Sequence, residues 1–120
     1  INWTEGEKHF RNCLLDFNKA NNVAQWQWVA GCGADAAPYF RIFNPILQGE
    51  KFDKDGVYVK RWVPELIKVP KKFIHKPWEM ETKYQEAIKT IIGKNYPKPI
   101  VIHEEARAAA LKAFQSLKKN

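Results

Sequence analysis

Two tryptophans two residues apart, Trp26 and Trp28, are the residues of this sequence best suited to do chemistry. An indole ring can lose an electron without breaking a bond, and its flat face can stack on a base, so the pair suits electron transfer or base recognition. On a helix, positions two apart point about 200° away from each other, so the two rings cannot serve one neighbour. Composition by itself favours a simpler role, in which both rings fill the two sides of a buried helix.

A loop that mixes aromatic and basic residues follows the tryptophans, over residues 35–48. It interleaves Tyr39 and Phe43 with Arg41, and its two prolines stiffen it, so that little entropy is lost on binding. Rings beside a guanidinium suit stacking on single-stranded nucleic acid, at roughly 1–3 kcal/mol per base. The loop therefore indicates a nucleic-acid contact.

The charge of the chain points to the same class of partner. Lys and Arg number 20 against 13 Asp and Glu, which gives a formal net charge of +7, and an excess of this sign favours a polyanion. Residues 51–76 are especially basic, which fits either a phosphate-binding face or ordinary solvated lysine. Two cysteines with no zinc spacing and the lack of a long apolar run lead us to expect a cytoplasmic location, no metal site and no membrane partner.

The hydrophobic spacing predicts an all-α fold with long irregular connections. Thr4 and Glu7 form a capping-box pattern before the first helix, and Gly31 and Gly93 are positioned to stop later ones. Turn-forming pairs predict irregular backbone over 44–49, and prolines predict an extended segment over 68–77. Helices are predicted over residues 5–17, 23–30, 55–62, 79–92 and 103–118.

Together, these segments resemble the DNA photolyase and cryptochrome family, in the C-terminal part of its flavin-binding helical domain. The resemblance rests on NWTEGEKHF, on the run from NNVAQWQWVAGCGADAAPYF to RIFNPILQGEKFD, on RWVPEL and IHKPW, and on YPKPIV with the final EEAR helix. It covers nearly all 120 residues and is closest to photolyases that act on cyclobutane pyrimidine dimers. We therefore expect residues 1–120 to form a partial FAD-binding domain, without the antenna domain and the first part of the helical domain.

The resemblance implies a catalytic role for three residues on the flavin side. Trp26 would lie against FAD and pass it an electron, Trp3 would be the middle member of the electron-transfer chain, and Asn22 would face the reactive N5 of the flavin. Asn18 departs from the acidic residue usual in the family, and turn or cap chemistry explains it equally well. The implied cofactor-binding residues are Asp16, Phe17, Asn18, Asn22 and Trp26.

On the DNA side, the resemblance implies that Trp28 stacks on flipped pyrimidines while the loop enters the space that they leave. The expected partners are DNA containing pyrimidine dimers and either the upstream part of the protein as a separate chain or a second copy of this one. The implied contacts to DNA or lesion are Trp28, Tyr39, Arg41, Phe43, Gln48 and Lys51.

The activity that the resemblance implies is light-driven, FAD-dependent reversal of pyrimidine dimers, a carbon–carbon lyase reaction. A cryptochrome-like photoreceptor is one alternative, although Trp28 and Asn22 argue against it, since plant cryptochromes usually carry Tyr and Asp there. A flavin-free basic helical module that binds nucleic acid is the other, and Asn18 and Val23 support it. Because the Arg partner of Asp16 and the phosphate-binding loop lie upstream in the family, we expect the isolated chain to bind FAD weakly or not at all.

Overall fold

The computed structural model describes residues 1–35 and 41–117, and within them every regular element is helical, as predicted. The chain divides into two compact units, Ile1–Ile42 and Phe43–Asn120, called the first and second unit below. The α-helices are α1 Trp3–Cys13, α2 Lys19–Val29, α3 Pro45–Phe52, α4 Val57–Trp62, α5 Thr82–Ala87 and α6 His103–Leu117, and 3-10 helices cover Pro64–Leu66 and Pro77–Glu79.

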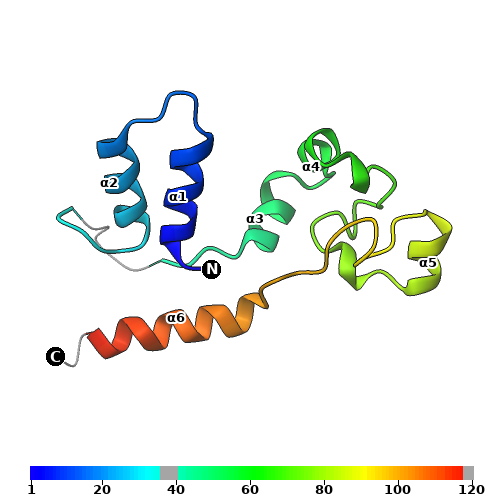
Figure 1. The fold of residues 1–120 in the computed structure, drawn as a ribbon. Helices are drawn as coiled ribbons and strands as arrows, with labels where there is room; N and C mark the ends of the chain where they lie inside the picture. The colour runs from blue at the N-terminus through cyan, green and yellow to red at the C-terminus, as the bar shows by residue number, and fades with distance from the viewer. Residues whose placement is uncertain (36–40, 118–120) are drawn as a thin grey trace. The chain divides into compact units, whose positions relative to one another are not determined.

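The first unit is a helical hairpin, in which α1 and α2 lie side by side and run in opposite directions (Figure 1). The side chain of Asn2 caps α1 by accepting a hydrogen bond from the backbone N–H of Thr4 at 3.0 Å, so the capping box predicted at Thr4 is wrong. The predicted first helix also ran too far, because Leu14 adopts an extended backbone, with ψ at 127°, and ends α1 at Cys13.

The second helix begins earlier than residue 23, because Asn18 adopts an extended backbone and its side chain accepts from the N–H of Asn21 at 3.0 Å. Asparagines read from the sequence as helix breakers therefore start α2. Its end agrees with the prediction, since Gly31 follows the helix with a φ of +73°.

The second unit begins with α3, where irregular backbone was predicted over 44–49. That prediction was wrong, because Asn44 and Pro45 form a helix start. The Asn44 side chain accepts from Ile46 N at 3.0 Å and Leu47 N at 3.3 Å, and Pro45 occupies the first turn, where no backbone donor is needed.

Asp53 initiates α4 from a distance, since the cap residue Gly56 has no side chain. Its carboxylate accepts from Tyr58 N at 3.1 Å and Val59 N at 3.2 Å. Burial disfavours the charged form, but these N–H donors and the nearby His75 outweigh it and hold the pKa of Asp53 below its usual value of 3.8. The start of α4 is therefore tied to an ionised carboxylate.

A small apolar core holds the second unit together. Leu66, Val69, Ile74 and Met80 are buried in it, and Val59, Val63, Phe73, Ile88 and Tyr96 pack around them. The segment 68–77 supplies part of this core as consecutive turns, with Phe73 N bonded to Pro70 O at 2.9 Å, so the predicted extended conformation is wrong.

The helix predicted over 79–92 is only α5, Thr82–Ala87. The buried Gln85 ends it, because its side-chain oxygen accepts from Ile92 N at 2.9 Å and its backbone oxygen from Thr90 N at 2.9 Å. Lys89, at a φ of 58°, makes the turn that these bonds require. The last helix, α6, begins at residue 103 as predicted.

Candidate functional site

Trp26 leaves α2 on the side that faces α1. The Phe10 and Trp26 rings meet edge to face, with centroids 5.1 Å apart and planes at 82°. The six-membered part of the indole lies against Gly6, where an added Cβ would overlap it. Trp26, which is predicted to pass an electron to the cofactor, therefore packs on the backbone of α1. Trp3, the other tryptophan predicted to carry electrons, is the first residue of the same helix.

Trp28 has a different neighbourhood, as the spacing predicted. It lines a hollow of about 400 Å³ in the first unit, and 37% of its surface is exposed. The turn after α2 closes one side, since Cys32 N donates to Gln27 O at 2.9 Å and Gly33, with a φ of +87°, packs against the Gln27 side chain. An exposed indole beside side-chain amides can stack on a flat ring and hydrogen-bond to its edge.

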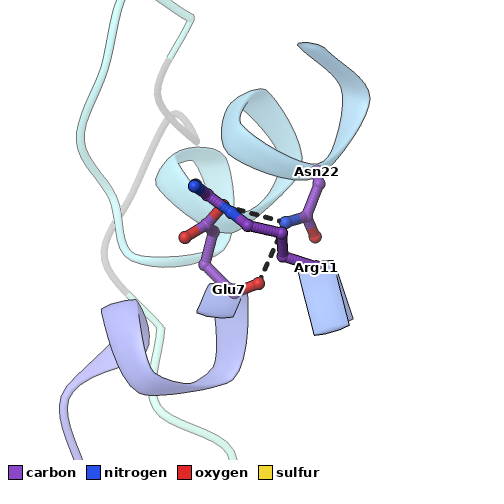
Figure 2. Close-up of polar contacts among 3 residues, drawn as sticks. All are labelled: Glu7, Arg11 and Asn22. Atoms are coloured by element: carbon purple, nitrogen blue, oxygen red, sulfur yellow. Dashed lines mark hydrogen bonds and ion pairs between the residues drawn. The ribbon is translucent and has the colours of Figure 1, made fainter. Parts of the chain in front are cut away.

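Asn22 is buried between the two helices of the hairpin, with only 8% of its surface exposed. Its side-chain nitrogen donates to the backbone oxygen and to Oε1 of Glu7, each at 3.0 Å (Figure 2). The same carboxylate oxygen accepts from Arg11 Nη2 at 2.7 Å. Asn22 is thus a fixed, charge-supported amide rather than a mobile surface group.

The other residues predicted to contact the cofactor lie in and beside the loop between α1 and α2. Asp16 is exposed, and no residue of ranges 1–35 and 41–117 forms a hydrogen bond or ion pair with its carboxylate. Phe17 is half-buried. Asn18 uses its side-chain oxygen for the cap of α2, which is the local role weighed for it from sequence.

The predicted DNA contacts are divided between the units. Arg41 is exposed near the end of the first unit, whereas Phe43, Gln48 and Lys51 are exposed in the second. Lys51 Nζ lies 5.0 Å from the centre of the neighbouring Phe52 ring. Tyr39 lies outside the described residues.

The basic stretch of the second unit is only partly neutralised. Lys71 pairs with Asp55 at 3.5 Å, and both side chains are largely exposed, so the pair is weak. Lys76 lies 3.0 Å from Glu50, and this hydrogen bond and charge, with Glu79 at 3.7 Å, raise the pKa of Lys76 above its usual value. Lys76 is therefore less available to phosphate than its exposed neighbours.

Besides Lys51, two more cations of the basic stretch lie over aromatic rings. Arg61 lies 5.0 Å from the Trp62 ring and Lys72 lies 5.2 Å from the Phe73 ring.

Within the described ranges, no group of three or more His, Cys, Asp or Glu side chains could hold a metal ion. No helix in that part of the chain is long and apolar enough to cross a membrane.

Three residues of this site, Gly6, Glu7 and Phe10, were not assigned to it from the sequence. Glu7 was interpreted only as part of a capping box. Their common signal is the spacing: Gly6 and Phe10 lie four residues apart on one face of α1, as do Glu7 and Arg11. Only the pairing of α1 with α2 shows that these faces meet Trp26 and Asn22.

The first unit offers two chemical environments. One is the Trp26 indole packed on α1, with the buried amide of Asn22 one turn earlier on α2, which suits one edge of a flat redox cofactor such as a flavin ring. The other is the hollow at Trp28, which suits a flat ring presented from solution. An exposed Cys13 Sγ also lies 3.6 Å from His9 Nδ1 on α1. The packed indole and the hollow are the features that suit electron transfer and stacking.

Comparison with known proteins gives one consistent result. The model of the FAD binding domain of DNA photolyase matches residues 1–116. A deoxyribodipyrimidine photo-lyase from Agrobacterium fabrum is 57% identical over 119 residues, and one from Escherichia coli is 48% identical over 119 residues. These matches cover 99% of this chain but 25% and 24% of the relatives, so the chain spans about a quarter of their length.

Solved structures agree with the sequence matches. A bacterial class III photolyase from Agrobacterium tumefaciens superposes with a TM-score of 0.86 at 57% identity, covering 100% of this chain and 25% of that one. A cryptochrome from Synechocystis superposes with a TM-score of 0.83 at 35% identity, covering 93% of this chain and 23% of that one.

Proposed function

This chain belongs to the DNA photolyase family through its FAD-binding domain, and from that premise we propose that it serves light-driven, FAD-dependent reversal of cyclobutane pyrimidine dimers in DNA. The observation that carries the proposal is the 57% identity to a deoxyribodipyrimidine photo-lyase over 99% of the chain. The two separate environments of Trp26 and Trp28 support it, because the reaction needs both an electron path and a place for the damaged bases.

Each residue of the first unit has a separate part in this mechanism. FAD, when bound, would supply one-electron chemistry, with Asp16, Phe17, Asn22 and Trp26 among the residues that would hold it. Trp26 and Trp3 relay electrons that keep the cofactor reduced, since indoles are oxidised without bond cleavage. Asn22 would accept from the cofactor through its amide oxygen, since its nitrogen is bonded to Glu7, and Asp16 would supply an exposed carboxylate.

The DNA side of the mechanism uses stacking and charge. Trp28 stacks on the extruded pyrimidines within the hollow of about 400 Å³. Arg41 contacts the flipped site, and exposed lysines of residues 51–76 hold the phosphate backbone without reading sequence. The proposed partner is therefore duplex DNA that carries a dimer.

A hybrid protein tests this proposal, in which the matching quarter of the Agrobacterium fabrum relative is replaced by this chain. We expect it to bind FAD and to remove dimers from ultraviolet-treated DNA in blue light but not in the dark. The matched control is the same hybrid with Trp28→Ala. A hybrid that binds FAD and yet leaves the dimers in place under light contradicts the proposed activity.

The chain alone provides a second measurement. Only one edge of a flavin site can be built from its described residues, so we expect weak or no FAD binding, followed by absorbance after dialysis against FAD. A yellow chain with stoichiometric FAD would show instead that these residues, or two copies of them, form a whole site.

A photoreceptor without repair is the second candidate, because the Synechocystis cryptochrome is also similar over 93% of the chain. Its signature in the hybrid protein would be normal photoreduction of FAD, together with no preference for damaged over undamaged duplex. Trp28 in the open hollow favours repair over this alternative.

A further inference from the structure

We propose that Gly6 is a positioning residue for electron transfer, because its missing side chain sets how closely the Trp26 indole approaches α1 and therefore Trp3. The inference rests on the proposed function, since it concerns the relay of electrons through these two tryptophans.

The contact between Gly6 and Trp26 is unusually close. A Cβ added to Gly6 would overlap the indole, lying 2.5 Å from Cζ3 and 2.8 Å from Cζ2. Phe10, one turn further along α1, meets the same ring edge to face at 5.1 Å. The indole thus packs on the helix backbone at Gly6 and on the edge or face of the Phe10 ring, and a methyl group at Gly6 has to displace it.

The backbone of α1 has no need of glycine at this position. Gly6 is not among the residues with positive φ, and it lies inside the helix, where glycine costs about 1 kcal/mol relative to alanine. Alanine should therefore stabilise α1 unless a neighbour needs the space. The neighbour on the other side of that space is Trp26.

Gly6 also stands at the right place on α1. Trp3 lies three residues earlier, so positions 3 and 6 are on the same face of the helix. Electron transfer between rings slows steeply with separation, and moving Trp26 away from this face lengthens the path from Trp3. Gly6 is thereby coupled to the rate of the relay without touching DNA.

A double-mutant cycle on the chain itself tests the contact, read as thermal unfolding by circular dichroism. We expect Gly6→Ala to lower the melting temperature with Trp26 present and to raise it in the Trp26→Phe background, where the ring is smaller. Asn12→Ala, an exposed site on α1, is the control and should raise the melting temperature equally in both backgrounds. A rise for Gly6→Ala in both backgrounds overturns the inference.

The hybrid protein tests the consequence for electron transfer. Gly6→Ala should slow photoreduction of bound FAD severalfold, because electron transfer between rings slows steeply as their separation grows. Repair with chemically reduced FAD should stay at the parent level, which a merely unfolded variant would not achieve. Unchanged photoreduction overturns the inference while the proposed function stands. A parent hybrid without photoreduction or repair overturns the proposed function, and the relay role of Gly6 with it.

Discussion

Asn22 of α2 donates two hydrogen bonds to one residue of α1, Glu7: one to its backbone oxygen and one to its carboxylate, each at 3.0 Å. Both N–H groups of the amide are then used, and the carboxylate is balanced by Arg11 at 2.7 Å. A ligand that approaches Asn22 without breaking this arrangement must offer a donor to the amide oxygen. The pair thus joins the two helices of the hairpin and leaves only the amide oxygen of Asn22 to accept a hydrogen bond from a ligand.

We expect Asn22→Asp to destabilise the hairpin by about 1–3 kcal/mol at pH 7, because it removes both donors and sets a second carboxylate against Glu7. Urea denaturation followed by circular dichroism measures the loss. Adding Glu7→Gln should recover part of it, since an amide at position 7 can donate to the new carboxylate. No recovery in the double variant would mean that the two side chains do not interact.

The hydrogen bonds that Asp53 accepts predict that acid lowers the stability of the second unit. The pKa of Asp53 is held below 3.8 in the folded chain despite burial, chiefly by the N–H groups of Tyr58 and Val59, so its contribution is present above pH 3.8 and is lost as the pH falls through the lowered value. Unfolding between pH 5 and pH 2, about the range in which carboxylates titrate, should be less pH-dependent in Asp53→Asn. Asp55→Asn, at an exposed carboxylate, is the control and should keep the wild-type profile.

The parts of the fold that the sequence predicted are those set by local spacing. The 3.6-residue repeat of α6 and Gly31 after α2 needed no information from distant residues. The all-α class was also predicted from the sequence. The family was predicted because its motifs keep their order along the chain, and the relatives are named as photolyases in agreement with it.

The predictions that were wrong involve side chains that replace backbone partners. Asn44 looked like a turn residue because asparagine favours both turns and caps, and only the bonds to Ile46 and Leu47 decide between the two. Gln85 looked like an ordinary helix former, yet its bond to Ile92, seven residues on, ends α5 early. The spacing of apolar residues could not reveal that Trp26 packs against Gly6 either, since Gly6 is twenty residues away in sequence.

In the hybrid protein, we expect Trp26→Phe to abolish photoreduction of FAD yet largely spare repair once the FAD is chemically reduced. The reason is position, since Trp26 packs on α1 and Trp28 lines the hollow. Trp28→Ala should do the opposite, keeping photoreduction and weakening binding of the dimer. Transient absorption and a dimer-binding titration separate the two. Equal loss of photoreduction in both variants would show that the indoles do not have separate roles.

Arg41 and the lysines of the second unit should act on DNA in different ways. Replacing Lys60, Arg61, Lys71 and Lys72 with Gln should weaken binding to damaged and undamaged duplex alike, because phosphates carry no sequence or lesion information. The slope of log affinity against log salt should flatten by roughly 0.9 for each phosphate that the variant no longer neutralises.

Arg41→Ala should instead reduce the preference of the hybrid protein for damaged over undamaged duplex. A group that reaches the extruded bases binds them only where a lesion makes extrusion cheap, so its removal is felt mainly on damaged DNA. The measurement is a salt titration of affinity on both duplexes, with the four-residue Gln variant as the control for general charge. If Arg41→Ala lowers both affinities by the same factor, the residue is one more backbone contact and its assignment to the flipped site is wrong.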